Sequence, residues 1–330
     1  YSPSPGIEEA REAVRRQAER NGIRAIRDII ITQGASEAIE LCLTALLEPG
    51  DNILLPQPGY PLYSSVLAKL NAEVNPYYLN EEDNWNLDVA DIESRINSGT
   101  RGIVIINPNN PTGAVYPKET LAQLIELARK HNLVLFSDEI YDKLVFDGIE
   151  YTSMASLCDD IPIVTFNGLS KSYVVPGFRI GWAIFSGPSE VLKYYIGGVN
   201  KMVRARLSAN HPVQYAIQPA LEGPQDHIPH MLEALKKRRD ITVSMLNDMD
   251  EFDCSIPQGA FYAFPTLNIP DEDEHFVKDL IRETGVVTVH GSGFGEKPGS
   301  KHLRIVFLPN EKLLEEAYDK IRKFVNKRYH

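Results

Sequence analysis

The sequence has few cysteines and no long hydrophobic stretch. Its three cysteines, Cys42, Cys158 and Cys254, are odd in number and widely separated. This spacing supports neither a disulfide framework nor a CxxC metal motif, so we expect reduced thiols in a cytoplasmic protein. Hydrophobic residues make up 43% of the chain, but no uninterrupted apolar run approaches the length of a membrane-spanning helix. We therefore expect a soluble protein with no membrane partner.

Basic residues are also in short supply. The chain has 34 Lys and Arg against 45 Asp and Glu, which gives a net charge of -11 at pH 7. Nucleic-acid binding needs a basic surface that neutralises phosphates, so this balance argues against a nucleic-acid partner. The eight histidines form no HExxH motif, and His227 and His230 have no evident carboxylate partner. We predict no metal site.

The length and the alternation of sequence patterns predict two domains. A chain of 330 residues exceeds the size at which a single core usually stops growing. Short β-branched runs alternate with amphipathic stretches, which is typical of an α/β fold with a mostly parallel sheet covered by helices. The predicted strands are residues 28–32, 52–55, 101–107, 133–137, 161–166 and 180–185.

The pattern changes after a long, charged helical stretch at about residues 226–249. Strand-like segments at 260–264, 286–290 and 302–307 then alternate with helical segments at 274–284 and 311–327. This order favours a smaller α+β domain. We therefore expect a large domain at residues 1–225 and a small C-terminal domain at residues 226–330, joined by the long helix.

Distinctive residues follow the ends of five predicted strands. In open α/β sheets, ligands bind beside the carboxyl ends of the strands. Gly34-Ala35-Ser36 opens a helix after the first strand, where backbone N–H groups and the helix dipole can hold a phosphate. The later strands are followed by PQPGYPLY with Tyr60, NPNNPTG with Asn110, SDEIY with Asp138 and Tyr141, and NGLSKSYVVPGFR with Ser170, Lys171 and Arg179.

Each of these features alone has an ordinary structural explanation. Gly-Ala-Ser often does no more than begin a helix, and an Asp after a strand often caps one. Their occurrence together at successive strand ends has no such explanation. Together they supply an amine for an aldehyde, a carboxylate for a pyridine nitrogen, an aromatic face and phosphate donors. These are the requirements of pyridoxal 5′-phosphate.

The segments resemble the signature motifs of the class I/II aminotransferases, which are fold-type I pyridoxal-phosphate-dependent transferases. The motifs are NPNNPTG, SDEIY and NGLSKSYVVPGFRIGW, and the resemblance extends from Tyr1 to the C-terminus. TFNGLSKSY and INPNNPTGAVY are most similar to the alanine (glutamate-pyruvate) aminotransferases. An ordered set of motifs is far more specific than any one of them.

The resemblance implies roles around the cofactor ring. Lys171 would form a Schiff base with the cofactor, and Asp138 would keep the pyridine nitrogen protonated. Tyr141 and Asn110 would hydrogen-bond the phenolic oxygen of the ring. Tyr60 would stack on the face of the ring.

The resemblance also implies a phosphate site and a substrate site. Ser36, Arg179 and the amide of Ala35 would hold the phosphate, with arginine favoured because its guanidinium can donate two parallel hydrogen bonds. Arg304, in the segment HLRIVF, would bind the substrate α-carboxylate from the small domain, and Asn110 would contribute to the same site.

The chain departs from the resembled family in two places. Gly168 stands where many relatives carry a phosphate-binding hydroxyl, so Ser170 is a further candidate contact for the cofactor. YSPSPG resembles a Tyr-x-x-x-x-Gly segment, which implies that Tyr1 reaches the cofactor phosphate of the partner subunit in a homodimer with shared active sites. The family's N-terminal arm has no counterpart ahead of Tyr1, and we expect the natural protein to be longer.

The predicted reaction is exchange of an amino group between alanine or glutamate and a 2-keto acid, pyruvate or 2-oxoglutarate. Two alternatives remain. One is a lyase or synthase of the same fold that acts on the β or γ carbon, because fold does not fix the reaction. The other is a non-catalytic, cofactor-binding domain of a transcription regulator, which would normally accompany a basic DNA-binding module. The sequence contains no such module.

Overall fold

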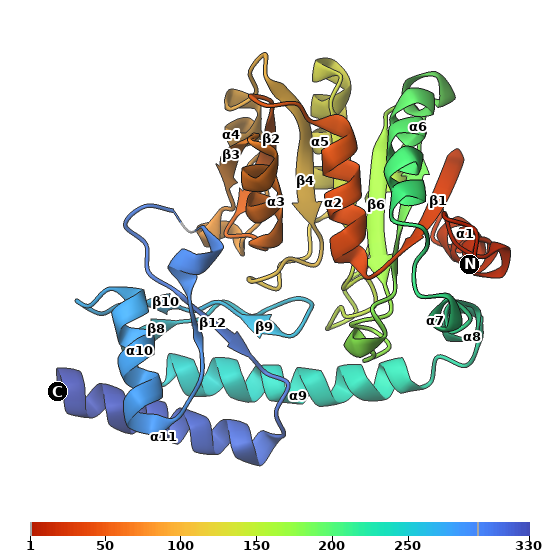
Figure 1. Ribbon diagram of the computed structural model, residues 1–330. Coiled ribbons are helices and arrows are strands. Elements are labelled where there is room, and N and C mark those ends of the chain that lie inside the picture. Colours follow the sequence, from red (N-terminus) through yellow and green to blue (C-terminus); the bar gives the residue numbers. More distant parts are fainter. Residues whose placement is uncertain (1, 296) are drawn as a thin grey trace.

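The computed structural model describes residues 2–295 and 297–330, and a seven-stranded sheet forms its centre (Figure 1). The strand order is β1-β7-β6-β5-β4-β2-β3. β7 is antiparallel to β1 and β6, and the other neighbours are parallel. The strands are β1 (Ile26–Thr32), β2 (Asn52–Gln57), β3 (Glu73–Tyr78), β4 (Thr100–Ile106), β5 (Val134–Asp138), β6 (Ile163–Gly168) and β7 (Gly181–Ser186).

The predicted α/β fold with a mostly parallel sheet is confirmed, and all six predicted strands are present within a few residues of their expected bounds. The sequence did not predict β3. This strand lies at the edge of the sheet and is only partly buried. It contains Pro76, which lacks an N–H for a sheet ladder and is tolerated at an edge. Its pattern is therefore weaker than that of the central strands.

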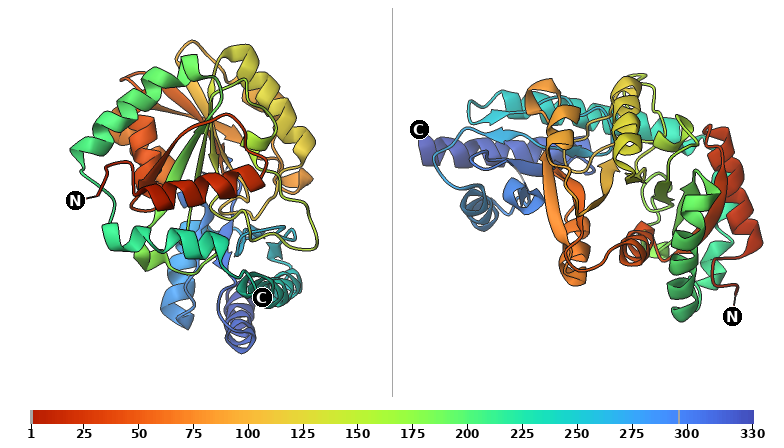
Figure 2. Two further views of the ribbon diagram at one scale, coloured as in Figure 1. Left: turned by 90° about the vertical axis from the view of Figure 1, so that its right-hand side faces the viewer. Right: turned by 90° about the horizontal axis from the view of Figure 1, so that it is seen from above.

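Helices cover both faces of the sheet (Figure 2). Side chains of α1 (Glu8–Arg20), α4 (Val89–Ser94) and α5 (Lys118–His131) share one apolar core with Ile103 and Ile105 of β4. Side chains of α2 (Ala35–Leu46), α3 (Leu62–Leu70) and α6 (Ser189–Ala205) share another with Val104 and Ile106. Successive residues of a strand point to opposite faces, so a strand covered on both sides is apolar throughout.

The apolar spacing of α5 explains why that helix forms and packs. Leu121, Leu124, Ile125 and Ala128 recur every three or four residues and are buried against the sheet. The helix ends where Asn132 adopts a left-handed conformation with φ of 54°. Asparagine accepts this conformation more readily than most residues, so it is a common helix terminator.

The remaining elements lie mostly below the carboxyl ends of the sheet strands in Figure 1. α9 and α11 lie side by side at the bottom of the view. Two small antiparallel sheets, β10-β8 and β11-β12-β9, lie between these helices and the large sheet. α9, α10, α11 and the small strands share a further apolar core, to which Ile140, Tyr141, Leu144 and Phe146 also belong. The elements are α7 (His211–Gln214), α8 (Ile217–Glu222), α9 (His227–Asn247), β8 (Phe252–Asp253), β9 (Tyr262–Ala263), β10 (Thr266–Leu267), α10 (Asp273–Thr284), β11 (Val289–His290), β12 (Leu303–Val306) and α11 (Glu311–Tyr329).

The C-terminal strands β9, β11 and β12 are shorter than the segments predicted for them. The division at residue 225 stays a prediction, and we refer to residues 226–330 as the small domain on that basis. Across the two described ranges, the chain contains no helix with the length and apolar character that a membrane crossing requires.

Candidate active site

A cavity of about 250 Å³ lies where the ends of β4, β5 and β6 meet the start of α2 and the small-domain strands β9 and β12. About 10–15 Å³ is enough for one water molecule, so this cavity can hold a small organic molecule. Tyr1 lies outside the described residues. Every other predicted site residue lines the cavity: Ala35, Ser36, Tyr60, Asn110, Asp138, Tyr141, Ser170, Lys171, Arg179 and Arg304.

Asp138 is the last residue of β5, and its side chain is buried. Its carboxylate accepts a hydrogen bond of 3.0 Å from the hydroxyl of Tyr63 and one of 3.3 Å from the backbone N–H of Ile140. Burial raises the pKa of Asp138 to about 6, although these two donors and the nearby Lys171 act in the opposite direction. A positively charged N–H group of a ligand would favour the ionised carboxylate.

Lys171 lies on the segment between β6 and β7, and its ammonium nitrogen is 5.6 Å from the ring centres of both Tyr141 and Phe261. Burial lowers the pKa of Lys171, and the cations of Arg304 and Arg179 lower it further, while Asp138 opposes them. A lysine with a lowered pKa is more often neutral, and only the neutral amine can attack an aldehyde. The site therefore favours a nucleophilic amine.

Arg179 and the start of α2 form an anion site. The guanidinium donates to the carbonyls of Pro176, at 3.1 Å, and Gln33, at 3.4 Å. It lies so close to Gly34 that a Cβ atom there would be 2.4 Å from Nη2 of Arg179. Gly34 also has a φ of 78°, which favours glycine. Together these features place a guanidinium beside the unpaired N–H groups that begin a helix, an arrangement suited to a phosphate.

Two further glycines let backbones approach closely at this site. A Cβ atom on Gly181 would lie 2.3 Å from the amide nitrogen of Ala35. Because Gly181 has no side chain, the turn between β1 and α2 can pack directly on β7. A Cβ atom on Gly168 would lie 2.7 Å from the carbonyl oxygen of Ile180. A side chain at this position, three residues before Lys171, would require the neighbouring backbone to move. Ser170 supplies a hydroxyl at the cavity wall.

Arg304 enters the cavity from β12. Nη1 donates a hydrogen bond of 3.2 Å to the side-chain oxygen of Asn110. The guanidinium carbon is 4.9 Å from the ring centre of Tyr262 and 4.6 Å from that of Phe294. Nε of Arg304 is buried and has no hydrogen-bond partner among the described residues. A buried cation with an unused donor is suited to binding a carboxylate.

Two tyrosines of the site were missed in the sequence analysis. Tyr63 is the last residue of the PQPGYPLY segment, and it lies in α3 and donates to Asp138. Tyr262 lies in β9, and its hydroxyl is 2.8 Å from the hydroxyl of Tyr141, 121 residues away. The segment GAFYAF had the pattern of a short strand only. Nothing local to that segment indicates a contact so distant in sequence.

The residues present fit pyridoxal phosphate. Lys171 provides the amine for the aldehyde, and the buried carboxylate of Asp138 provides a partner for a protonated pyridine nitrogen. The guanidinium over Gly34 provides an anion site of the kind a phosphate needs. The unpartnered Nε of Arg304 leaves a donor for a substrate carboxylate. All four groups line the same cavity or its immediate wall.

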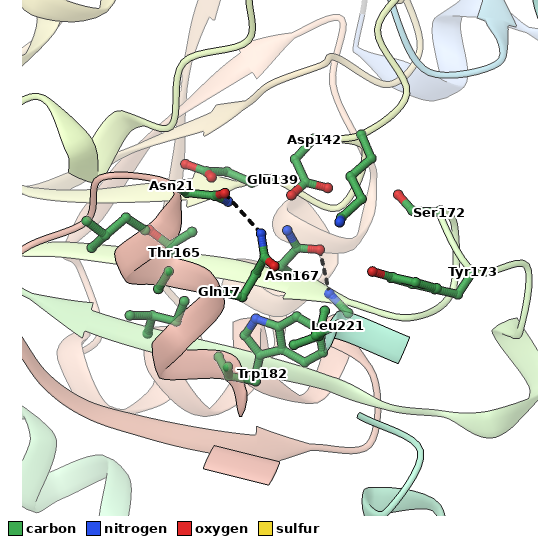
Figure 3. Close-up of a pocket in the computed structure, with 16 residues that line it drawn as sticks. Gln17, Asn21, Glu139, Asp142, Thr165, Asn167, Ser172, Tyr173, Trp182 and Leu221 are labelled. Carbon is green, nitrogen blue, oxygen red and sulfur yellow. Dashed lines mark hydrogen bonds between the residues drawn. The ribbon is translucent and has the colours of Figure 1, made fainter. Parts of the chain in front are cut away.

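Residues next to these site residues in sequence line a second cavity, of about 30 Å³ (Figure 3). Glu139 follows Asp138, and Ser172 follows Lys171; both side chains are buried there. The space is sufficient for one or two water molecules. Lys171 and Asp138 do not line it. We therefore assign the chemistry to the larger cavity.

Comparisons with known proteins agree with this geometry. Residues 1–321 match the model of the family described as aminotransferase class I and II. The chain is 40% identical over 334 residues to glutamate-pyruvate aminotransferase AlaA of Haemophilus influenzae, covering 99% of this chain and 82% of that protein. It is 41% identical to the alanine aminotransferase of Mycobacterium bovis, with 98% of this chain and 78% of that protein covered.

A solved structure is also close. Alanine aminotransferase from Pyrococcus furiosus superimposes with a TM-score of 0.96 at 38% identity, covering 99% of this chain and 84% of that one. These matches favour transamination over the lyase and regulator alternatives. The chain therefore belongs to the class I and II aminotransferase family, and it is a pyridoxal-phosphate-dependent aminotransferase.

Proposed function

We propose that the enzyme transfers the amino group of alanine or glutamate to a 2-keto acid, with pyruvate and 2-oxoglutarate as the acceptors. The observation that carries this proposal is the convergence of Lys171, Asp138 and Arg304 on one cavity. An amine, a carboxylate and a carboxylate-binding cation are the groups that amino-acid chemistry on this cofactor requires. The similarity to relatives named alanine and glutamate-pyruvate aminotransferases supports the choice of substrates.

In this proposal, residues of the large domain hold the cofactor. Arg179, Ser36 and the amide of Ala35 bind its phosphate, and Ser170 adds a hydroxyl near the lysine. Asp138 keeps the pyridine nitrogen protonated. When bound, pyridoxal phosphate supplies an aldehyde that joins to amines and a pyridinium ring that withdraws electrons from the substrate α-carbon.

The residues on the ring's edge and face orient it. Tyr60 would cover one face, while Asn110 and Tyr141 would donate to the phenolic oxygen. All three side chains line the cavity. The hydrogen bond between Asn110 and Arg304 also connects the cofactor side of the site to the substrate side.

Lys171 has two successive tasks. Its amine would hold the cofactor through the aldehyde until a substrate amine takes its place. The released Nζ, whose pKa is lowered by burial, would accept the proton from the substrate α-carbon and deliver it to the former aldehyde carbon of the cofactor. The reverse sequence with a keto acid completes the exchange.

Arg304 binds the α-carboxylate that all amino acids share, so it does not choose among side chains. The cations that line the cavity are Lys171, Arg179 and Arg304, and each has a role already. A methyl side chain needs no further charged partner. Alanine is accordingly the first substrate to test.

We also propose that the enzyme is a cytoplasmic homodimer with shared active sites, in which Tyr1 reaches the partner's cofactor phosphate. Val174 and Phe178 support a protein interface beside the site. They lie on the segment between Lys171 and Arg179, and they are 67% and 46% exposed. Exposed apolar side chains that cluster in this way mark interaction surfaces.

The test of the reaction is an absorbance-monitored half-reaction of the cofactor-loaded enzyme with a panel of amino acids. Alanine and glutamate should change the cofactor spectrum and release one equivalent of keto acid. Pyruvate and 2-oxoglutarate should restore the spectrum. Release of ammonia, or a spectrum that no amino acid changes, would contradict the proposal.

A further inference from the structure

Tyr262 is a polar residue of the cavity wall to which no role has yet been given. It belongs to β9 in the small domain, and its side chain is buried. Its hydroxyl lies 2.8 Å from that of Tyr141, and its ring faces the guanidinium of Arg304. One side chain thus contacts a proposed cofactor residue through its hydroxyl and a proposed substrate residue through its ring.

The direction of the hydrogen bond between the two hydroxyls follows from their proton count. Each phenol carries one proton and can donate one hydrogen bond. In the proposed site, Tyr141 donates its proton to the cofactor's phenolic oxygen. Tyr141 can then only accept from Tyr262. Burial raises the pKa of both phenols, so both keep their protons near neutral pH.

The other charged groups around the pair do not compete for the Tyr262 proton. The guanidinium of Arg304 has no atom that can accept a hydrogen bond, and it lies over the ring of Tyr262. Lys171 is a donor when it is protonated. Asp138 is an acceptor, but the hydrogen bonds it accepts come from Tyr63 and from the backbone of Ile140, whereas the hydroxyl within hydrogen-bond distance of Tyr262 is that of Tyr141. The hydroxyl of Tyr141 is therefore the acceptor that the site offers to Tyr262.

We propose that Tyr262 is a positioning residue, whose hydroxyl donates to Oη of Tyr141 and directs the proton of Tyr141 to the cofactor's phenolic oxygen. Hydrogen bonds in a chain strengthen one another, so this donation makes Tyr141 a stronger donor. Tyr262 comes from the small domain and Tyr141 from the large one. The contact consequently links the cofactor's electronic state to the arrangement of the two domains. This inference rests on the proposed role of Tyr141.

The experiment is a pH titration of the visible absorbance of the cofactor-loaded enzyme. Tyr262→Phe removes the hydroxyl and keeps the ring beside Arg304, so the fold and the cation–π contact are retained. When Tyr141 donates more weakly, the cofactor's phenolic oxygen becomes more basic. The proton shared between that oxygen and the Lys171 nitrogen is then lost only at higher pH, and loss of this proton is what the absorbance reports. The midpoint should rise by a few tenths of a pH unit, since cooperative strengthening is only about 10–30% per bond.

Comparison with Tyr141→Phe tests whether Tyr262 acts through Tyr141. That variant should raise the midpoint further, and the double variant should match it with no added shift. Non-additivity of this kind is the mark of two groups acting through one contact. Tyr318→Phe is the matched control. It removes another buried small-domain hydroxyl, one that donates 2.9 Å to Thr242, and it should leave the midpoint unchanged.

An unchanged or lowered midpoint in Tyr262→Phe, or an additive shift in the double variant, would overturn the inference. Thermal unfolding of each cofactor-free variant verifies that it is folded before titration. The half-reaction of the wild-type enzyme with alanine is measured separately. A failed half-reaction together with the expected shifts would refute the proposed substrates and leave the role of Tyr262 standing.

Discussion

At the scale of single residues, the site depends on charges held at unusual pKa values. Asp138 is buried in the cavity wall, and burial outweighs the hydrogen bonds from Tyr63 and Ile140 that favour its charged form. Without a ligand, ionising Asp138 therefore destabilises the fold. The cofactor's protonated pyridine nitrogen would reverse this effect. The carboxylate is thus positioned to bind a cationic ligand, and it lowers the stability of the protein when that ligand is absent.

Asp138→Asn tests this trade-off. The pKa of Asp138 is about 6 in the folded protein and 3.8 for a free side chain. The fold therefore favours the protonated carboxyl. Stability is highest below pH 3.8 and falls as pH rises through 6, where Asp138 ionises. At pH 7 the cofactor-free variant should be more stable than wild type, by about 3 kcal/mol at most, while transamination should nearly vanish. Urea unfolding at pH 5 and pH 8 measures the first effect. Equal stability differences at both pH values would contradict it.

Arg304→Ala should weaken binding of every amino acid, because the α-carboxylate is common to all substrates. A charge-assisted hydrogen bond of this kind contributes roughly 1.5–3 kcal/mol, so the Michaelis constants should rise by about one to two decades. Arg304→Lys is the control that keeps the charge and loses the planar fork. An effect confined to one amino acid would instead make Arg304 a side-chain selector.

At the scale of elements, the phosphate site depends on how closely α2 begins against its neighbours. Gly34 lies directly under the Arg179 guanidinium, and Gly181 lies against the first amide of the helix. Small residues at both points let the helix N-terminus and the arginine converge. The anion site is thus built by a turn and a backbone contact as well as by a charged side chain.

Gly34→Ala should therefore disrupt cofactor binding. The added Cβ would lie 2.4 Å from Nη2 of Arg179, and we expect cofactor affinity to fall at least about tenfold, since a displaced charge-assisted bond costs at least about 1.5 kcal/mol. Gly148→Ala is the matched control, because Gly148 also has a positive φ but nothing lies within 4 Å of its added Cβ. Both variants should lose some stability, and only Gly34→Ala should lose affinity in a fluorescence titration of the cofactor-free protein. Equal affinities would argue against the site.

At the scale of the whole molecule, the cavity is assembled from two parts of the chain that the sequence separates widely. The cofactor side comes from the ends of β5 and β6 and the start of α2, while Tyr262 and Arg304 come from β9 and β12. In the proposed site, catalysis therefore depends on how the segment with Tyr262 and Arg304 packs against the strand ends of the sheet. In the proposed dimer it depends on a second copy as well.

Val174→Glu tests the proposed dimer. A carboxylate at this exposed apolar position would be buried against the partner, where an unpaired charge is strongly unfavourable. The variant should shift from dimer toward monomer in sedimentation equilibrium and lose cofactor affinity. Val287→Glu changes a side chain that is 76% exposed in the small domain, and it should remain dimeric. A monomeric wild type would refute the shared site.

The sequence was sufficient for the family, the fold class and ten residues of the cavity wall, but not for Tyr262. Periodic apolar runs specify buried strands and helices, and the residues that follow parallel strands must meet at one edge of the sheet. For this reason Ser36, Asn110, Asp138 and Lys171 could be brought together on paper before any coordinates were known. The sequence did not predict β3, because an edge strand with a proline lacks the apolar pattern of a buried strand.

Only the tertiary structure decided which side chains touch. Tyr63 is 75 residues from Asp138, and Tyr262 is 121 residues from Tyr141. Local patterns report burial and secondary structure, but they contain no information about which distant hydroxyl reaches which oxygen. That choice depends on the packing of helices on the sheet and of one domain on the other, where a shift of about 1 Å makes or breaks a hydrogen bond.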